Sequence, residues 1–230
     1  MKKKVLSLCL VLVLVAIAIT GATLAYFTDA DEAVNTFSVG SVEIELIESN
    51  FHPVVDNKTE AEIREDAKTY DTSVENVVPG QWVRKAPYVI NQGRNDAYVR
   101  VRMVVDKFFN DHMVRTETTT AQEDGSIIAT INWYDENGNF VDSSDTYKEV
   151  ENYATIEYVY TYTKALAPGE MTYWPAFWQY KIADELDQDV FADYIENSTE
   201  IVIAVYANAI QAETFDSAIE AFAAFDQQAA

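Results

Sequence analysis

From Ala97 to Val105 the chain reads Ala-Tyr-Val-Arg-Val-Arg-Met-Val-Val, with an apolar side chain at every second position. Tyr98, Arg100 and Arg102 occupy most of the intervening positions. Successive side chains of a β-strand point to opposite faces of a sheet, so this run predicts a strand with one buried face. Such a strand needs partners, and the sequence supplies them on both sides.

Further strand-like runs lie before and after this one. Their alternating apolar members are Val42, Ile44 and Leu46, then Ile127, Ala129, Ile131 and Trp133, then Tyr158, Tyr160 and Tyr162. The stretch from Ile201 to Ala209 is apolar on both faces, which predicts a central strand buried from two sides. Many short strands of this kind predict an all-β chain folded as a β-sandwich.

Turn-forming dipeptides separate the predicted strands. They are Pro79-Gly80 and Pro168-Gly169 before strand-like segments, and Gln92-Gly93 and Asp124-Gly125 at expected hairpin ends. Asn137-Gly138 lies between two apolar pairs, which predicts a two-residue hairpin. Three segments favour helices instead: residues 58–70, 182–195 and 215–227. No internal repeat or linker interrupts the pattern, so residues 41–230 are predicted to form one domain.

Residues 1–25 have the composition of an export signal. A basic start and a long apolar run are followed by Thr23 and Ala25, small residues that suit a signal peptidase. Cleavage is therefore expected between Ala25 and Tyr26. The apolar run also has the length of a membrane helix, so an uncleaved anchor is the alternative and the only membrane contact expected.

Charge and cysteine content limit the class of protein. The leader holds three of the 16 basic residues and none of the 38 acidic ones, so the remaining chain carries a net charge of −25. Nucleic acid and anionic lipid would repel such a chain, whereas divalent cations and basic partners would not. The single cysteine, Cys9, lies in the leader, so no disulfide is expected. A lysine-rich leader on a cysteine-free domain indicates a secreted or cell-surface protein of a Gram-positive bacterium.

Ordered matches along the chain resemble the TasA/camelysin family. They are Ala22-Thr23-Leu24-Ala25-Tyr26-Phe27-Thr28-Asp29 with Asn35-Thr36-Phe37-Ser38-Val39-Gly40, Val78-Pro79-Gly80 with Val89-Ile90-Asn91-Gln92-Gly93 and Asp96-Ala97-Tyr98-Val99-Arg100-Val101, Leu166-Ala167-Pro168-Gly169-Glu170, and Ala207-Asn208-Ala209-Ile210-Gln211-Ala212. The resemblance implies a jelly-roll-like antiparallel β-sandwich that is exported through a SipW-type signal peptidase. It further implies homopolymeric biofilm-matrix fibres built by N-terminal strand donation, with an accessory matrix protein as a second partner. Camelysin has been described as a surface metallopeptidase, which makes that activity the first alternative.

The segment of residues 26–40 has the features that strand donation needs. Cleavage frees it from the leader, after which its backbone can pair with a sheet edge while apolar side chains enter pockets there. The predicted polymerisation residues are Tyr26, Phe27, Val34, Phe37 and Val39. The alternative is that the segment folds back as the first strand of its own sheet.

The sequence contains few residues in arrangements that are typical of a catalytic site. His52 and His112 are the only histidines, and no His-Glu-x-x-His arrangement exists, whereas zinc hydrolases commonly use three protein ligands. Both histidines are predicted to be solvated surface residues. No catalytic or metal-ligating residue is predicted, and the chain is not expected to be an enzyme.

Calcium, bound weakly, is the one cofactor that the acidic composition leaves open. Asp135-Glu136-Asn137-Gly138 superficially resembles an EF-hand loop, but its glycine comes fourth instead of sixth and Thr146 stands at the twelfth position. That departure favours the hairpin. The other candidate ligands are Asp142 and Asp145, and Asp184, Glu185, Asp187 and Asp189. Runs of acids are more typical of a solvated face.

Residues 173–180 form the densest aromatic cluster. Its members are Tyr173, Trp174, Phe177, Trp178 and Tyr180. Core and edge packing is the favoured interpretation, because buried rings contribute much contact area. A stacking platform for sugars is the alternative, so a secreted carbohydrate- or host-binding sandwich is the second alternative function.

Overall fold

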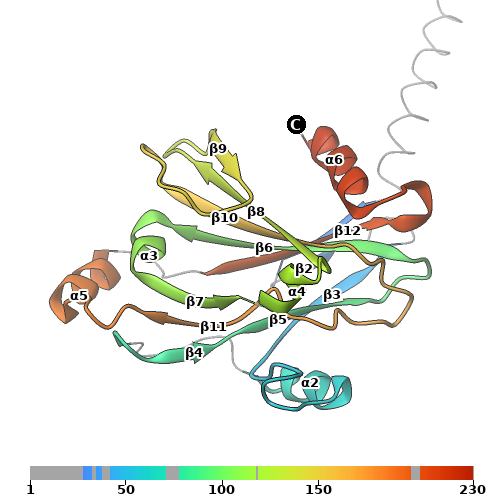
Figure 1. The fold of residues 1–230 in the computed structure, drawn as a ribbon, viewed down its shortest axis with the longest axis horizontal. Coiled ribbons are helices and arrows are strands. Elements are labelled where there is room, and N and C mark those ends of the chain that lie inside the picture. Colours follow the sequence, from blue (N-terminus) through green and yellow to red (C-terminus); the bar gives the residue numbers. More distant parts are fainter. Residues whose placement is uncertain are drawn as a thin grey trace, which may run out of the picture.

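A computed structural model describes residues 28–32, 35–37, 42–70, 78–117, 119–197 and 203–229 of the chain. Strands predominate, and every strand pairing in this part of the chain is antiparallel. They form two layers with a shared apolar interior (Figure 1). The predicted all-β, sandwich-like architecture is confirmed at this level.

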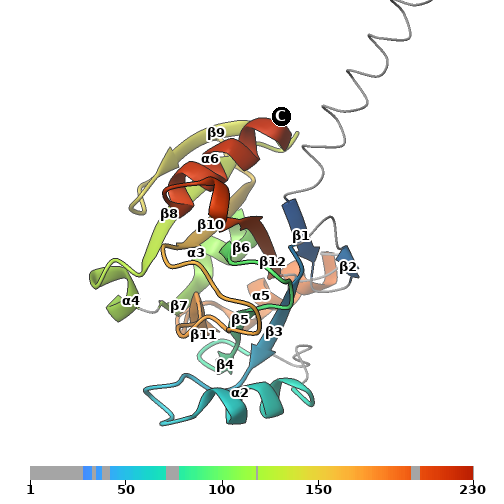
Figure 2. The same cartoon turned by 90° about the vertical axis from the view of Figure 1, so that its right-hand side faces the viewer.

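The larger layer is a seven-stranded sheet. In spatial order its strands are β2 (Asn35–Phe37), β1 (Thr28–Glu32), β12 (Ala204–Gln211), β6 (Ala97–Asp106), β10 (Thr155–Tyr162), β8 (Ile127–Tyr134) and β9 (Phe140–Ser144). The predicted central strand β12 lies between β1 and β6. Figure 2 shows β1 and β2 at one end of this sheet, and β8 and β9 at the other.

The second layer consists of two smaller sheets. One contains β4 (Trp82–Arg84), β11 (Phe177–Ile182) and β7 (Met113–Glu117), and the other pairs β3 (Ile44–Ser49) with β5 (Ala86–Asn91). A single bridge between Ile90 and Met171 links β5 to the segment that leads into β11. Both small sheets contribute to the interior that the large sheet covers, as Val83 and Val89 show.

Strand β6 confirms the alternation seen in its sequence. The side chains of Ala97, Val99 and Val101 are completely buried between the layers, and Met103 and Val105 are 1% exposed. The intervening residues face outward, where helix α6 (Ala218–Ala229) covers part of the sheet. Because one face of β6 is apolar and the other carries arginines, a one-residue shift in its pairing would bring charge into the core.

Both Pro-Gly dipeptides form the predicted turns. The Gln81 N–H bonds to the Val78 carbonyl at 3.1 Å, and the Glu170 N–H bonds to the Ala167 carbonyl at 2.9 Å. Gly80 and Gly169 adopt φ of +84° and +81°, as a turn with proline followed by glycine requires.

The other turn predictions need correction. A β8–β9 hairpin forms, but its loop has five residues: the Gly138 N–H bonds to the Asp135 carbonyl, and Gly138 adopts φ of +77°. Asn137-Gly138 is therefore not a two-residue turn. Gln92-Gly93 and Asp124-Gly125 are not hairpin ends, because the first crosses from β5 to β6 in the other layer and the second follows helix α4 (Thr119–Glu123). A turn-forming dipeptide predicts that the chain changes direction, but it does not predict which strands pair with each other.

Helices form in all three predicted segments. Helix α2 (Glu60–Ala67) begins with a capping box between Thr59 and Glu62, and the Thr59 backbone N–H holds the pKa of Glu62 at about 2. Helix α6 begins inside the third segment, at Ala218, and ends at Ala229, two residues beyond it. The second prediction was partly wrong, because Ile182 ends strand β11 and helix α5 spans only Gln188–Asn197.

Short helices were not predicted from the sequence. Helix α3 (Lys107–His112), helix α4 and the 3-10 turn η1 (Ala212–Thr214) are each too short to show a periodic apolar face. Within the described ranges no helix is long and apolar enough to cross a membrane. The predicted leader, residues 1–25, lies outside those ranges.

Candidate functional site

Most residues predicted to act in polymerisation lie outside the described part of the chain. These are Tyr26, Phe27, Val34 and Val39, and the expected cleavage site at Ala25 falls there as well. Phe37 ends strand β2, where it is the backbone partner of Ala30. The cleavage and polymerisation assignments therefore remain predictions.

The described part of the N-terminal segment pairs with its own sheet. β1 runs antiparallel to β12, with Thr28 opposite Ile210 and Glu32 opposite Tyr206. β2 then pairs with the outer side of β1. This is the arrangement considered above as the alternative to donation, and it is the one the isolated chain adopts for these residues.

The sequence of β1 is poorly suited to holding a sheet edge. The strand reads Thr-Asp-Ala-Asp-Glu, and aspartate and glutamate are depleted in strands. Its register sets Asp29 opposite Ala209 and Asp31 opposite Ala207, although both alanines are completely buried in the core. The β1–β12 contact thus joins an acidic strand to one of the most apolar strands of the sheet. The residue types of β1 therefore give this pairing little support.

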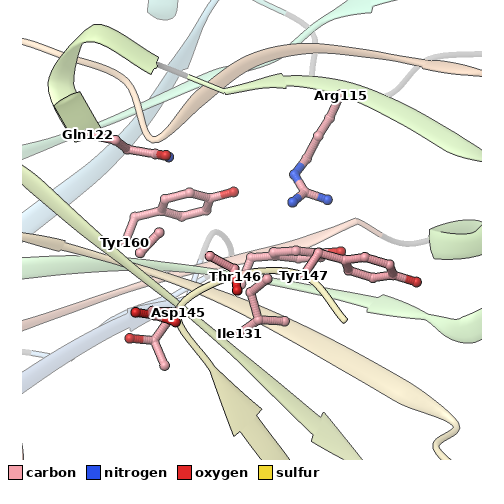
Figure 3. Close-up of a pocket in the computed structure, with 10 residues that line it drawn as sticks. Arg115, Gln122, Ile131, Asp145, Thr146, Tyr147 and Tyr160 are labelled. Carbon is pink, nitrogen blue, oxygen red and sulfur yellow. The ribbon is translucent and has the colours of Figure 1, made fainter. Parts of the chain in front are cut away.

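A pocket of about 240 Å³ lies at the other end of the same sheet (Figure 3). It is lined by Arg115 of β7, Gln122 of α4, Tyr158 and Tyr160 of β10, and residues around Ile131 of β8 and Tyr147. Figure 3 shows Arg115 entering from one side and Asp145 and Tyr147 on the opposite side. The pocket therefore lies between Arg115 of β7 and the segment that follows β9.

Aromatic rings and one cation determine the chemistry of this pocket. The Arg115 guanidinium carbon lies 3.5 Å from the centre of the Tyr158 ring, a cation–π contact. The Tyr158 hydroxyl donates to Asn110 Oδ1 at 2.5 Å, which fixes the ring from its far end. A pocket of this kind suits an aromatic side chain with a neighbouring acid. No sequence periodicity identified Arg115 or Tyr147 as site residues, since they meet only through the fold.

The histidine prediction was wrong for His52. This residue is 5% exposed, and its ring lies 5.5 Å from the rings of both Trp174 and Trp178. Its Nδ1 accepts hydrogen bonds from the Val54 and Val55 backbone N–H groups at 3.3 and 3.2 Å. Burial lowers the pKa of His52; the Asp56 carboxylate opposes that effect and the Arg84 guanidinium adds to it. His52 is thus a buried residue that shapes a turn.

The other histidine, His112, is only half-buried. His112 ends helix α3 and its ring lies 4.7 Å from that of Phe108. Over the described ranges no group of three or more His, Cys, Asp or Glu residues is arranged to hold a metal ion.

Four of the acids considered for calcium have protein partners. Asp142 forms an ion pair of 2.7 Å with Lys148, and Asp184 pairs with Lys181. Asp187 accepts from the Asp189 backbone N–H at 2.7 Å, beside the start of helix α5. Asp135 accepts two backbone hydrogen bonds within its turn, from Asn137 and Asn139. These acids organise turns and helix ends.

The aromatic block serves mainly in packing, as predicted. Phe177 is completely buried and Tyr180 is 8% exposed, whereas Tyr173 is 63% exposed. One outward ring of the block is already in use, because the Arg84 guanidinium carbon lies 4.4 Å from the centre of the Trp178 ring. A stacked cation leaves less of that ring free for a sugar.

Comparison with known proteins adds no assignment. No protein-family model, curated protein or solved structure matches this chain. The function therefore has to be argued from the sequence pattern and from the two ends of the large sheet.

Proposed function

We propose that this chain is a secreted structural subunit of biofilm-matrix or cell-surface fibres, a jelly-roll-like sandwich that polymerises by donating its N-terminal strand. The observation that carries the proposal is the β1–β12 pairing. An acidic strand with low strand propensity covers β12, whose residues Ala207 and Ala209 are completely buried. A strand of low strand propensity can exchange one sheet edge for another, because the backbone hydrogen bonds that pair it are of the same kind at either edge.

Removal of the leader is the switch in this proposal. Before cleavage at Ala25, the segment starting at Tyr26 is joined to the apolar leader and cannot reach another subunit. After cleavage, Tyr26 and Phe27 lie at a free end of the chain and add apolar residues to a strand whose own sequence is Thr-Asp-Ala-Asp-Glu. A donor surface and a different acceptor surface give a head-to-tail contact, which propagates as a filament instead of closing as a dimer.

A disulfide lock tests the proposal in the full mature chain. Asp29 and Ala209 are register partners, and the chain beyond the leader has no cysteine of its own. Cysteines at directly opposed antiparallel positions fall within disulfide reach. The oxidised Asp29→Cys, Ala209→Cys variant should form no fibres by electron microscopy, and reduction should restore them.

The matched control places a disulfide elsewhere in the same sheet. Val104 and Ala204 are register partners in β6 and β12, and linking them leaves β1 free. This control should assemble when oxidised. Fibres from the oxidised Asp29→Cys, Ala209→Cys chain, with the intramolecular bond verified by mass spectrometry, would refute strand donation. Fibres from a chain lacking Tyr26 to Phe37 would refute it independently.

A further inference from the structure

The end of the large sheet opposite β1 is formed by the β8–β9 hairpin. β9 is the last strand in the sheet order, and it pairs only with β8 among the strands that the structure describes. No strand of the described chain lies on its other side, and at Ser143 the backbone is bonded locally: its N–H donates to Asp142 Oδ1 at 2.8 Å and its carbonyl accepts from Lys148 Nζ at 3.4 Å. An added strand would replace these local bonds. An open edge of this kind is a template for pairing with another chain.

Exposed apolar side chains accompany this edge on both faces of the sheet. Phe140 is 61% exposed and lies against Tyr134 with 6.2 Å between the ring centres. Tyr147 is 54% exposed and lies 6.4 Å from the ring of Trp133, which is buried in the interior. Val141 and Ile128 are each 39% exposed. In a chain with so many acids, such a concentration of exposed apolar residues marks an interaction surface.

The Arg115 pocket adjoins the same edge. Asp145, Thr146 and Tyr147, which follow directly after β9, form one of its walls, and Arg115 comes from β7 of the other layer. A strand added along β9 would send alternate side chains to the Phe140 side and to the pocket side, because successive residues of a strand point to opposite faces.

From this arrangement we infer that β9 and the Arg115 pocket accept the N-terminal segment, residues 26–39, of a second copy of this chain. The inference rests on the proposed function and names the acceptor. Tyr26 and Phe27 match the exposed rings of Phe140 and Tyr147 in character, and the acids that follow them match the charge of Arg115.

Charge makes this match selective. Past the leader the chain has 13 basic residues left against 38 acidic ones, because three of the 16 lie in residues 1–25. Most faces of a neighbouring copy would therefore repel the acidic stretch of Asp29, Asp31 and Glu32. In the pocket Arg115 offsets the charge of Asp145, so the repulsion is weaker there than at a face that carries acids alone.

β12 of the second copy is the competing acceptor. In each folded chain it carries β1 on one side and β6 on the other, and a copy that donates residues 26–39 leaves the β1 side of its own β12 unpaired. The two acceptors differ in a donor-locked copy, in which β12 stays covered by β1 while β9 keeps its position at the end of the sheet. With β9 as the acceptor, donor and acceptor lie at opposite ends of one sheet, so each added copy extends the row of sheets in the same direction.

Two full-length variants test the acceptor separately from the donor. The acceptor variant, Phe140→Asp with Val141→Pro, places a charge and a proline on the exposed edge strand, where proline removes a backbone donor. The donor-locked variant is the oxidised Asp29→Cys, Ala209→Cys chain. Neither should form sedimentable fibres alone. An equimolar mixture should give 1:1 dimers by analytical ultracentrifugation, because one partner retains a donor and the other an acceptor.

The control is a chain with Val54→Asp and Val55→Asp, which alters two exposed valines in a loop before helix α2 and should polymerise like the unmodified protein. Circular dichroism and thermal unfolding establish that each variant is folded. Normal fibres from the acceptor variant, or a mixture without dimers, would overturn β9 as the acceptor. Fibres from the donor-locked chain would instead overturn strand donation itself.

Discussion

The side-chain amide of Asn91 donates a 2.8 Å hydrogen bond to the backbone carbonyl of Leu166, which lies 75 positions later in the chain. The same amide donates to the Asn95 carbonyl at 2.8 Å, and Asn91 Oδ1 accepts from the Gly93 N–H at 2.9 Å. Asn91 is completely buried. One side chain therefore shapes the crossing from β5 to β6 and fastens it to the segment after β10.

Replacing Asn91 by alanine should destabilise the fold strongly. The change removes three hydrogen bonds that this buried side chain makes with backbone groups, although the Leu166 carbonyl keeps its bond from the Ala97 N–H. A hydrogen-bonding group that is buried without a partner costs about 1–3 kcal/mol. We expect a loss of about 3 kcal/mol in the free energy of unfolding, measured by urea denaturation. The control Gln92→Ala removes a neighbouring exposed amide. Equal stabilities of the two variants would show that the Asn91 hydrogen bonds contribute little.

The contact between Arg100 and Asp226 should hold helix α6 on the sheet. Arg100 donates to both Asp226 oxygens, at 2.9 and 2.6 Å, and its guanidinium carbon lies 4.6 Å from the Phe222 ring centre. The Arg100 side chain is only 9% exposed, so the change Asp226→Asn leaves a buried cation poorly compensated. We expect a loss of about 2 kcal/mol and faster proteolysis near residue 218.

The comparison for that experiment is Asp216→Asn, which removes an exposed acid just before the same helix. Asp216→Asn changes the net charge of the chain by the same amount as Asp226→Asn. If both variants lose the helix at the same rate under limited proteolysis, general charge and not the Arg100 contact controls its attachment.

His52 should make stability depend on pH. Burial lowers its pKa in the folded chain below the ordinary value of 6.5, so below about pH 6.5 the unfolded chain binds more protons than the folded one. The His52 contribution to stability is complete above that range and is lost as the pH falls. His52→Asn, which keeps an acceptor at this position but does not titrate, should reduce the difference in unfolding free energy between pH 8 and pH 5.

Removing the other histidine, by His112→Asn, provides the reference for that measurement, because any effect of His52 remains. A His52→Asn variant whose stability falls as steeply with acid as that of the unmodified chain would contradict the prediction.

Gly80 should not tolerate a side chain. Its φ is +84°, and a Cβ atom there would lie 2.5 Å from Asp184 Oδ1. A non-glycine residue in this conformation costs about 1–2 kcal/mol. Gly80→Ala should therefore lower the free energy of unfolding by at least that amount. Gly169 has a similar φ of +81° with no atom within 4 Å of the added Cβ, so Gly169→Ala measures the backbone term alone. A smaller loss for Gly80→Ala than for Gly169→Ala would contradict the contact.

Cations should speed assembly by screening charge. Subunits with a net charge of −25 beyond the leader repel one another, and salt shortens the range of that repulsion. Chelation or low ionic strength should slow fibre growth followed by light scattering. In keeping with the ion-paired state of Asp142 and Asp184, sodium chloride at matched ionic strength should replace calcium. Growth rates that do not change with salt, calcium or magnesium would contradict this expectation.

Local patterns in the sequence predicted the elements of the fold well. The alternation from Ala97 to Val105 predicted β6, and the apolar run before Ala209 predicted a central strand, because side-chain period and burial are direct consequences of strand geometry. The charged stretch of residues 58–70 predicted a helix, and α2 lies within it. These inferences depend only on neighbours within a few residues.

The wrong predictions share one physical cause. A local sequence pattern carries no information on contacts between residues that are far apart along the chain. His52 is buried because Trp174 and Trp178, more than 120 positions away, enclose its ring. Gln92-Gly93 reverses the chain between layers because the strand that pairs with β6 comes from elsewhere.

The sequence alone determined the strand-rich character of this chain, its acidic charge and the composition of its N-terminal segment, since these follow from residue type and spacing. Only the tertiary structure decided that β1 covers β12, that β9 ends the sheet on the other side, and that Arg115 meets Tyr158 beside it. Those relationships join residues that are far apart along the chain, and the free energy of packing, not local propensity, selects them.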